Sequence, residues 1–125
     1  MNATLLVMAG GAIGAAGRYH LGRLTFHLGA IGYPFGTLAA NLAGGFFMGV
    51  LAGVLARSNF VDEPWRLLLG VGLLGGFTTF SAFSLEVFNM IERGETGTAV
   101  GYALISVMGS VLALFAGLIT VRALA

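Results

Sequence analysis

Residues 72–84 read GLLGGFTTFSAFS and lie within a stretch without charged side chains that runs from residue 67 to residue 85. About 20 apolar residues in succession can cross a bilayer as a helix. Three glycines and the pair Thr78-Thr79 are poor helix formers, so we expect this helix to break near residues 75–79. A break frees backbone groups that must find partners inside a membrane. Freed carbonyls can hold a small hard cation, although a kink made only for packing fits the same pattern.

Charged residues are few and divide the chain into similar apolar stretches. Of the 125 residues, 9% are charged and 58% are hydrophobic, whereas about a quarter of a soluble domain is charged. Most of the surface must therefore face lipid. We predict an all-α membrane protein that forms a single four-helix transmembrane domain over residues 1–125. Its helices are expected near residues 3–28, 35–56, 65–91 and 98–121.

The composition also excludes several classes of function. A net charge of +1 provides no basic surface for a nucleic acid. The absence of cysteine excludes disulfides, thiol chemistry and thiolate metal sites. No Ser/His, Asp/Asp or metal-ligand cluster suggests an active site, and both histidines, His20 and His27, lie in the outer part of the first helix. We therefore do not expect an enzyme.

The arginines give no preferred orientation in the membrane. Cytoplasmic flanks usually carry the excess of Lys and Arg. Here the side that holds both termini and the loop after the second helix has as many arginines as the other side. The two sets are Arg57, Arg66 and Arg122 against Arg18, Arg23 and Arg93. Such a chain can insert both ways, and two oppositely inserted copies can then pair about a two-fold axis. A single, weakly specified orientation fits the count equally well.

Small residues recur at helical spacing and predict close packing between helices. Gly45, Gly49 and Gly53 repeat every four residues on the second helix. Gly10 and Gly14 have the same spacing on the first helix. Faces of this kind let helix backbones approach closely in lipid, so a structural role is sufficient to explain them.

Polar side chains at membrane depth are energetically unfavourable and usually serve a function. Asn41 and Thr37 share one face of the second helix, and a hydrogen bond between helices is the simplest role for Asn41. On the fourth helix, hydroxyl groups recur every four residues at Tyr102, Ser106 and Ser110. These hydroxyls are compatible with a polar track, and equally with a chance coincidence of residues that bond their own backbone.

Aromatic and charged residues near the expected break are compatible with an anion path. Phe80 and Phe83 lie three residues apart, and the positive edges of their rings could attract an anion. Two rings packed against lipid or core would show the same spacing. Glu86 is expected at the rim of the third helix, as a residue whose charge reaches water. Arg18, near the end of the first helix, could draw anions into a vestibule, as could Arg23.

At these residues the chain resembles the family of small fluoride channels called Fluc or CrcB. The similarity is carried by GAIGAAGRY at residues 11–19, GTLAAN at residues 36–41 and GGFTTFSAFS at residues 75–84. It implies a fluoride-selective ion channel that passively exports fluoride and lowers its cytoplasmic concentration. It also implies an antiparallel, dual-topology homodimer that crosses the inner (plasma) membrane of a bacterium several times.

The resemblance also implies roles for individual residues in a pore that both chains line. Phe80 and Phe83 would present ring edges to fluoride, and Asn41 would donate a hydrogen bond to it. The remaining candidates share a hydroxyl group and are Thr37, Ser81, Ser84, Tyr102, Ser106 and Ser110. One departure is Ala82, where the family often has threonine, and this removes one hydroxyl from the track.

Vestibule and cation sites follow from the same resemblance. Arg18 and Glu86 would lie near the pore mouths. The backbone carbonyls of Gly75 and Thr78 from both chains would hold a structural Na+ at the centre of the dimer.

Two other classes of membrane protein remain as alternatives. A proton-coupled exporter of the small multidrug type also has four helices and often inserts both ways. It needs an acid buried in the membrane, but the first helix has none and Glu86 lies too near a helix end. The other alternative is a structural membrane subunit without transport activity.

Overall fold

The computed structural model describes residues 2–26, 33–57 and 63–124, and all regular secondary structure in these ranges is helical. The elements are α1 (Ala3–Thr25), α2 (Phe35–Arg57), α3 (Glu63–Trp65), the π-helical segment η1 (Arg66–Leu74), α4 (Gly75–Phe77), α5 (Phe80–Glu92) and α6 (Thr96–Ala123). Between α4 and α5, Thr78 and Thr79 have extended backbone.

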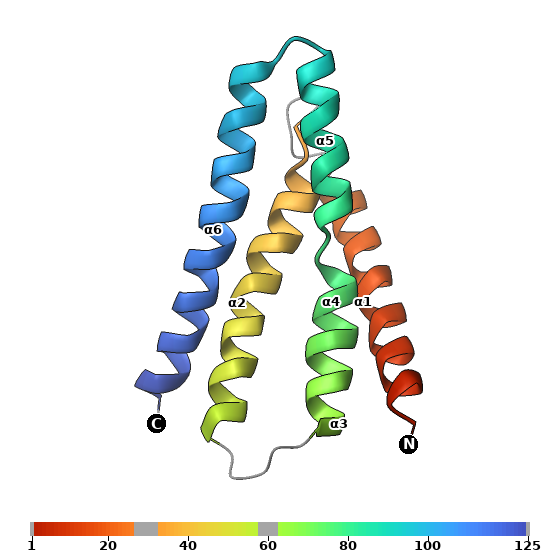
Figure 1. The fold of residues 1–125 in the computed structure, drawn as a ribbon, viewed down its shortest axis with the longest axis vertical. Coiled ribbons are helices and arrows are strands. Elements are labelled where there is room, and N and C mark those ends of the chain that lie inside the picture. Colours follow the sequence, from red (N-terminus) through yellow and green to blue (C-terminus); the bar gives the residue numbers. More distant parts are fainter. Residues whose placement is uncertain (1, 27–32, 58–62, 125) are drawn as a thin grey trace.

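The elements form an up-and-down bundle in which both chain ends lie at the same end of the molecule (Figure 1). The segments α3, η1 and α4 run in line, and α5 continues in the same direction beyond the two extended residues (Figure 1). The helices α5 and α6 extend past the ends of α1 and α2 and are joined by a tight turn (Figure 1). Gly94 in this turn has a φ of +79°, a conformation that glycine adopts without strain.

Three helical stretches within the described residues are long and apolar enough to cross a membrane. They are Phe35–Arg57, the combined run Glu63–Glu92, and Thr96–Ala123. The first helix, α1, has 23 residues, but Arg18, His20 and Arg23 occupy its last turns and it is not among the three. The expectation of a fourth span therefore stays a prediction.

The helix bounds differ from the expected ones mainly at the ends. The expected helices at residues 35–56 and 98–121 correspond to α2 and α6, each of which is slightly longer. The expected first helix, residues 3–28, corresponds to α1, which ends at Thr25. Residues 27–28 of that expectation, with His27, lie outside the described residues.

Glycines bring the helices together at backbone distance. A Cβ atom added to Gly49 on α2 would lie 2.0 Å from the carbonyl oxygen of Leu114 on α6. One added to Gly14 on α1 would lie 2.1 Å from the carbonyl oxygen of Leu73 on η1. Neither position has room for a side chain, so these glycines fix how closely α6 packs on α2 and how closely η1 packs on α1.

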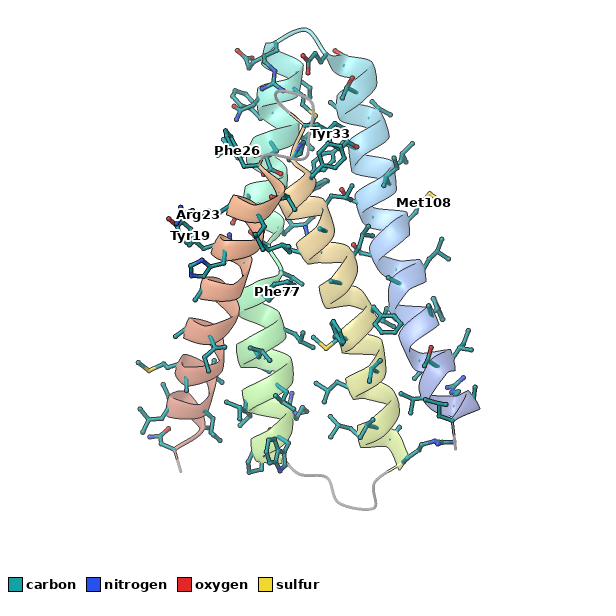
Figure 2. All side chains as sticks on the ribbon, turned by 180° about the vertical axis from the view of Figure 1, so that it is seen from behind. Tyr19, Arg23, Phe26, Tyr33, Phe77 and Met108 are labelled. Carbon is teal, nitrogen blue, oxygen red and sulfur yellow. The ribbon has the colours of Figure 1, made fainter. Side chains whose placement is uncertain are left out.

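The small buried core lies where α5 and α6 face the start of α2. It contains Phe83, Met90, Ala99 and Tyr102, and Tyr33 is one of the partly buried residues packed against it. Elsewhere large apolar side chains are exposed, and Figure 2 shows Met108 pointing away from the bundle. An apolar surface of this extent is expected where lipid or another chain replaces water.

Candidate functional site

Thr78 and Thr79 interrupt the third helical run, and their own side chains stabilise this interruption. The hydroxyl and the backbone N–H of Thr78 both donate to the carbonyl of Leu74, each at 3.0 Å, and so close the end of α4. The hydroxyl of Thr79 accepts a hydrogen bond from the N–H of Ala82 at 3.2 Å. This is the usual cap of a helix N-terminus, so the two threonines end one helix and begin the next.

Asn41 on α2 binds the backbone of Thr79 with both ends of its amide group. Its Nδ2 donates to the carbonyl of Thr79 at 3.1 Å, and its Oδ1 accepts from the N–H of Thr79 at 2.9 Å. Both backbone polar groups of Thr79 therefore have a partner, as a membrane interior requires. This is the hydrogen bond between elements that the sequence suggested as the simplest role for Asn41. The amide nitrogen carries a second hydrogen, so donation to an ion stays a prediction.

The carbonyls of Gly75 and Thr78 are among those at the interruption that lose the partners a continuous helix would give them. The N–H of Thr79, four residues after Gly75, donates to Asn41 instead. The N–H of Ala82, four residues after Thr78, donates to the side chain of Thr79. Carbonyl oxygens suit a small hard cation, so the donor chemistry of Gly75 and Thr78 fits the sodium that the resemblance implies. Within residues 2–26, 33–57 and 63–124, no group of three or more His, Cys, Asp or Glu side chains offers an alternative metal site.

A groove of about 420 Å³ lies beside the interruption and brings most of the expected pore residues together. Its walls include Asn41 from α2, Phe80 and Phe83 from α5, and Ser106 and Ser110 from α6. The two rings lie 5.4 Å apart at an angle of 46°. Phe83 is buried, whereas Phe80 is 75% exposed. The groove is therefore lined by two aromatic rings and by amide and hydroxyl groups, with apolar side chains such as Val107 and Leu114 between them, and the ring of Phe80 is exposed.

Ser106 is a residue of this groove with a buried hydroxyl. Its Oγ is buried and has no hydrogen-bond partner among the described residues. A buried hydroxyl without a partner is energetically unfavourable. A contact of Ser106 or Ser110 with fluoride stays a prediction.

Ser81 and Ser84 do not line the groove. The hydroxyl of Ser84 donates to the carbonyl of Phe80 at 2.9 Å, within its own helix, and the side chain is exposed. The hydroxyl of Ser81 lies 3.4 Å from that of Thr79. Their expected contact with fluoride stays a prediction, and the structure gives Ser84 the backbone bond that serines often make in helices.

Glu86 lies between two of the expected track residues. Thr37 on α2 donates to its Oε1, and Tyr102 on α6 donates to its Oε2, both at 2.7 Å. Tyr102 is fully buried, and its ring lies 5.3 Å from that of Phe83. The sequence alone placed Glu86 at an exposed rim; the structure instead has a half-buried carboxylate that ties α2, α5 and α6 together.

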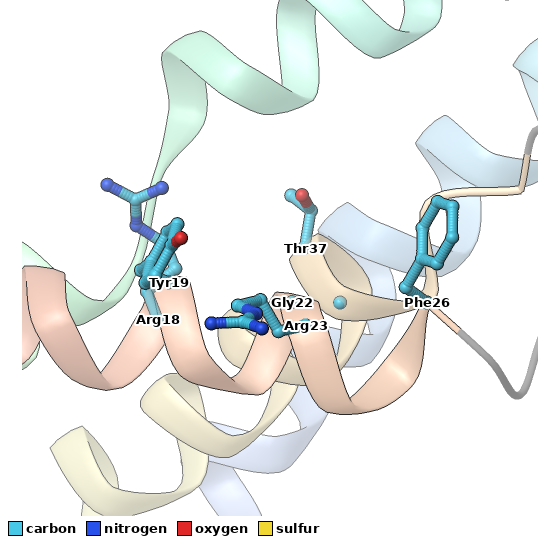
Figure 3. Close-up of a pocket in the computed structure, with 7 residues that line it drawn as sticks. Arg18, Tyr19, Gly22, Arg23, Phe26 and Thr37 are labelled. Atoms are coloured by element: carbon cyan, nitrogen blue, oxygen red, sulfur yellow. The ribbon is translucent and has the colours of Figure 1, made fainter.

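A second hollow, of about 540 Å³, lies between the end of α1 and the start of α2 (Figure 3). Arg18, Arg23 and Tyr19 line it from α1, and Thr37 lines it from α2 (Figure 3). The Nε atom of Arg18 is buried without a hydrogen-bond partner in the described part of the chain. Because Thr37 also bonds Glu86, this positively charged hollow adjoins the carboxylate.

Sequence reasoning missed the roles of Thr79 and Gly44. Thr79 directly precedes an apolar helical run, and threonine in that place is a signal for a helix cap. Gly44 lines the groove, but its position within a run of small residues gave no sign of which neighbour it faces.

Comparison with known proteins agrees with the resemblance seen in the sequence. A family model described as CrcB-like protein, Camphor Resistance (CrcB), matches residues 5–118. A relative from Phenylobacterium zucineum, named fluoride-specific ion channel FluC, is 59% identical over 123 residues, which cover 98% of this chain and 97% of the relative. A relative with the same name from Novosphingobium aromaticivorans is 51% identical, and the alignment covers both chains completely. Another, from Caulobacter vibrioides, is 50% identical over 98% of this chain and 97% of the relative. The chain therefore belongs to the CrcB family.

Proposed function

We propose that this protein is a fluoride-selective ion channel that lets fluoride leave the cell passively. The observation that carries the proposal is the groove beside the interruption, in which Phe80, Phe83, Asn41 and Ser106 come together. The names of the curated relatives support the same ion. Those names describe channels, so no chemical reaction and no enzyme activity are proposed.

The lining of the groove suits an anion that is small and strongly hydrated. Amide and hydroxyl groups donate hydrogen bonds that replace the water shell, and ring edges add a weak positive potential. None of the described residues that line the groove is a lysine or arginine, so the ion is not held by a full opposite charge and can leave again. A narrow path with fixed donors disfavours the larger chloride ion. A negative cell interior drives the anion outward by about 2.3 kcal/mol per 100 mV.

The working unit that we propose is an antiparallel, dual-topology homodimer in the bacterial inner membrane. The even division of the arginines removes the orientation signal. The groove is open beside the exposed ring of Phe80, and a second copy packed there would close it. Each of two pores would then be lined by both chains. In each chain, α1 would be the fourth helix that spans the membrane.

We place a structural sodium ion where the two copies meet. The carbonyls of Gly75 and Thr78 from each chain would supply its oxygen ligands. When bound, the ion would neutralise the partial negative charge of carbonyls that lack helical donors. It would not move with fluoride.

Efflux from liposomes tests the proposed function. Purified protein is reconstituted with internal potassium fluoride, and a fluoride electrode records release after a potassium ionophore is added, without a pH gradient. We expect rapid fluoride release and, in a matched chloride experiment, little chloride release. Comparable chloride rates would contradict the proposal.

The same assay separates the alternatives. Release that requires a proton gradient would favour the coupled exporter. Release no faster than from protein-free liposomes would favour a structural subunit, as would Phe80→Ile and Phe83→Ile variants that leave the fluoride tolerance of cells unchanged.

A further inference from the structure

One face of α2 holds both residues of the interruption. Asn41 and Gly44 are three residues apart and therefore point to the same side of the helix. Asn41 binds the backbone of Thr79. Gly44 lies against the preceding residue, Thr78.

The contact at Gly44 is one of shape. A Cβ atom added to Gly44 would lie 2.1 Å from the Cγ2 methyl of Thr78. The next atoms, Cδ1 of Phe77 and Cβ of Thr78, would both be 3.6 Å away, which is ordinary van der Waals contact. The methyl group of Thr78 thus fills the space that a side chain on α2 would take, and it is the single atom that obstructs one.

The Thr78 side chain is held in this orientation. Its hydroxyl donates to the carbonyl of Leu74 at 3.0 Å, and β-branched side chains have few accessible rotamers. Turning the methyl out of this space would break that hydrogen bond and leave the hydroxyl without its partner in the membrane, while the carbonyl of Leu74 would keep only the N–H of Thr78. A side chain on Gly44 must therefore displace the backbone of the interruption or separate it from α2.

We infer that Gly44, together with Asn41, is a positioning residue that sets the geometry of the interruption. The inference rests on the proposed function, because the interruption leads directly into Phe80 and carries the carbonyl of Thr78. Asn41 fixes Thr79 by two hydrogen bonds, and Gly44 fixes Thr78 by receiving its methyl group. The face of α2 that holds Thr78 and Thr79 thereby sets the direction in which the chain enters α5 and the ring of Phe80 points.

A cycle of two substitutions tests this inference. Gly44→Ala introduces the clash, and Thr78→Ser removes the methyl while keeping the hydroxyl that closes α4. We expect Gly44→Ala to lower fluoride efflux at least about tenfold, because displaced groups in a preorganised site lose function steeply. In the Thr78→Ser background the same alanine should change the rate by less than about threefold. The coupling between the two positions is the ratio of these two rate effects. If Thr78→Ser fully restores a tenfold loss, the coupling free energy is about 1.4 kcal/mol.

A matched control separates this contact from the general effect of alanine in a helix. Gly97 on α6 has no atom within 4 Å of an added Cβ. Gly97→Ala should therefore leave the efflux rate unchanged.

Hydrogen exchange at the Thr79 amide supplies a readout that does not depend on transport. That amide donates to Asn41, so Gly44→Ala should speed its exchange at least about tenfold, and the double variant should restore it. Unmodified protein that releases no fluoride would refute the proposed function, and the exchange data would still judge the inference. If Gly44→Ala yields no folded protein, recovery of folded protein in the double variant replaces the rate.

Two results would overturn the inference. The first is a Gly44→Ala variant that matches the unmodified protein in both efflux and exchange. The second is a double variant that shows no rescue of rate, exchange or folded yield.

Discussion

The close packing of α2 on α6 makes a quantitative prediction for Gly49→Ala. The added methyl would lie 2.0 Å from the carbonyl oxygen of Leu114, 2.8 Å from its carbonyl carbon and 3.0 Å from the nitrogen of Leu118. Carbon–oxygen contacts in proteins begin at about 3.3 Å, so the helices must separate there by about 1.3 Å. The obstructing atoms belong to the backbone and cannot rotate away. Overpacking typically destabilises by about 1–3 kcal/mol, and we expect the upper half of that range.

Unfolding of the purified protein in mixed micelles measures this effect. Sodium dodecyl sulfate is titrated against a mild detergent while circular dichroism follows the loss of helix. Gly97→Ala is the control, because alanine has a higher helix propensity than glycine and meets no neighbour there. Its free energy of unfolding should be unchanged or slightly higher. A Gly49→Ala value within about 0.5 kcal/mol of the unmodified protein, the range of a neutral surface change, would refute the packing described here.

Three further predictions concern the site and the assembly. Ser106→Ala should lower fluoride efflux by about tenfold or more, because a hydrogen bond to a charged group contributes about 1.5–3 kcal/mol; Thr120→Ala, on the same helix, should stay within about twofold, because that hydroxyl donates to the carbonyl of Ala116. Equal effects of the two would contradict this assignment. Thr98→Cys introduces a single cysteine at an exposed position after the α5–α6 turn. If the protein inserts both ways, a membrane-impermeant thiol reagent should label about half of the molecules from each side of the membrane. Labelling from one side alone would exclude dual topology. Sodium at a hundredfold excess over its Kd should stabilise the folded dimer by about 2.7 kcal/mol relative to N-methylglucamine. Identical unfolding curves in sodium and in N-methylglucamine would contradict the proposed sodium site.

The sequence predicted the arrangement along each helix better than the contacts between helices. Charged residues mark where apolar stretches end, and for this reason the expected ranges for α2 and α6 lie close to the observed ones. The glycines and threonines at residues 75–79 disfavour a continuous helix, which accounts physically for the extended backbone of Thr78 and Thr79.

The parts that the sequence left open depend on which face of a helix meets which neighbour. Glu86 binds Thr37 and Tyr102, which lie 49 and 16 residues away in the chain. A periodic pattern locates an acid along its helix, but it does not reveal two hydroxyl partners on separate helices. The same holds for Gly44, whose notch for the methyl of Thr78 exists only once α2 and the interruption are side by side.

The reversal potential of current through a planar bilayer tests the central claim most directly. Purified protein is inserted between solutions that hold equal chloride concentrations and a tenfold gradient of fluoride, first at equal pH and then with a pH difference. A passive fluoride-selective channel predicts reversal near the fluoride equilibrium potential, about 59 mV in magnitude for a single charge, at either pH setting. Reversal near zero, or a potential that follows the pH difference, would contradict the account.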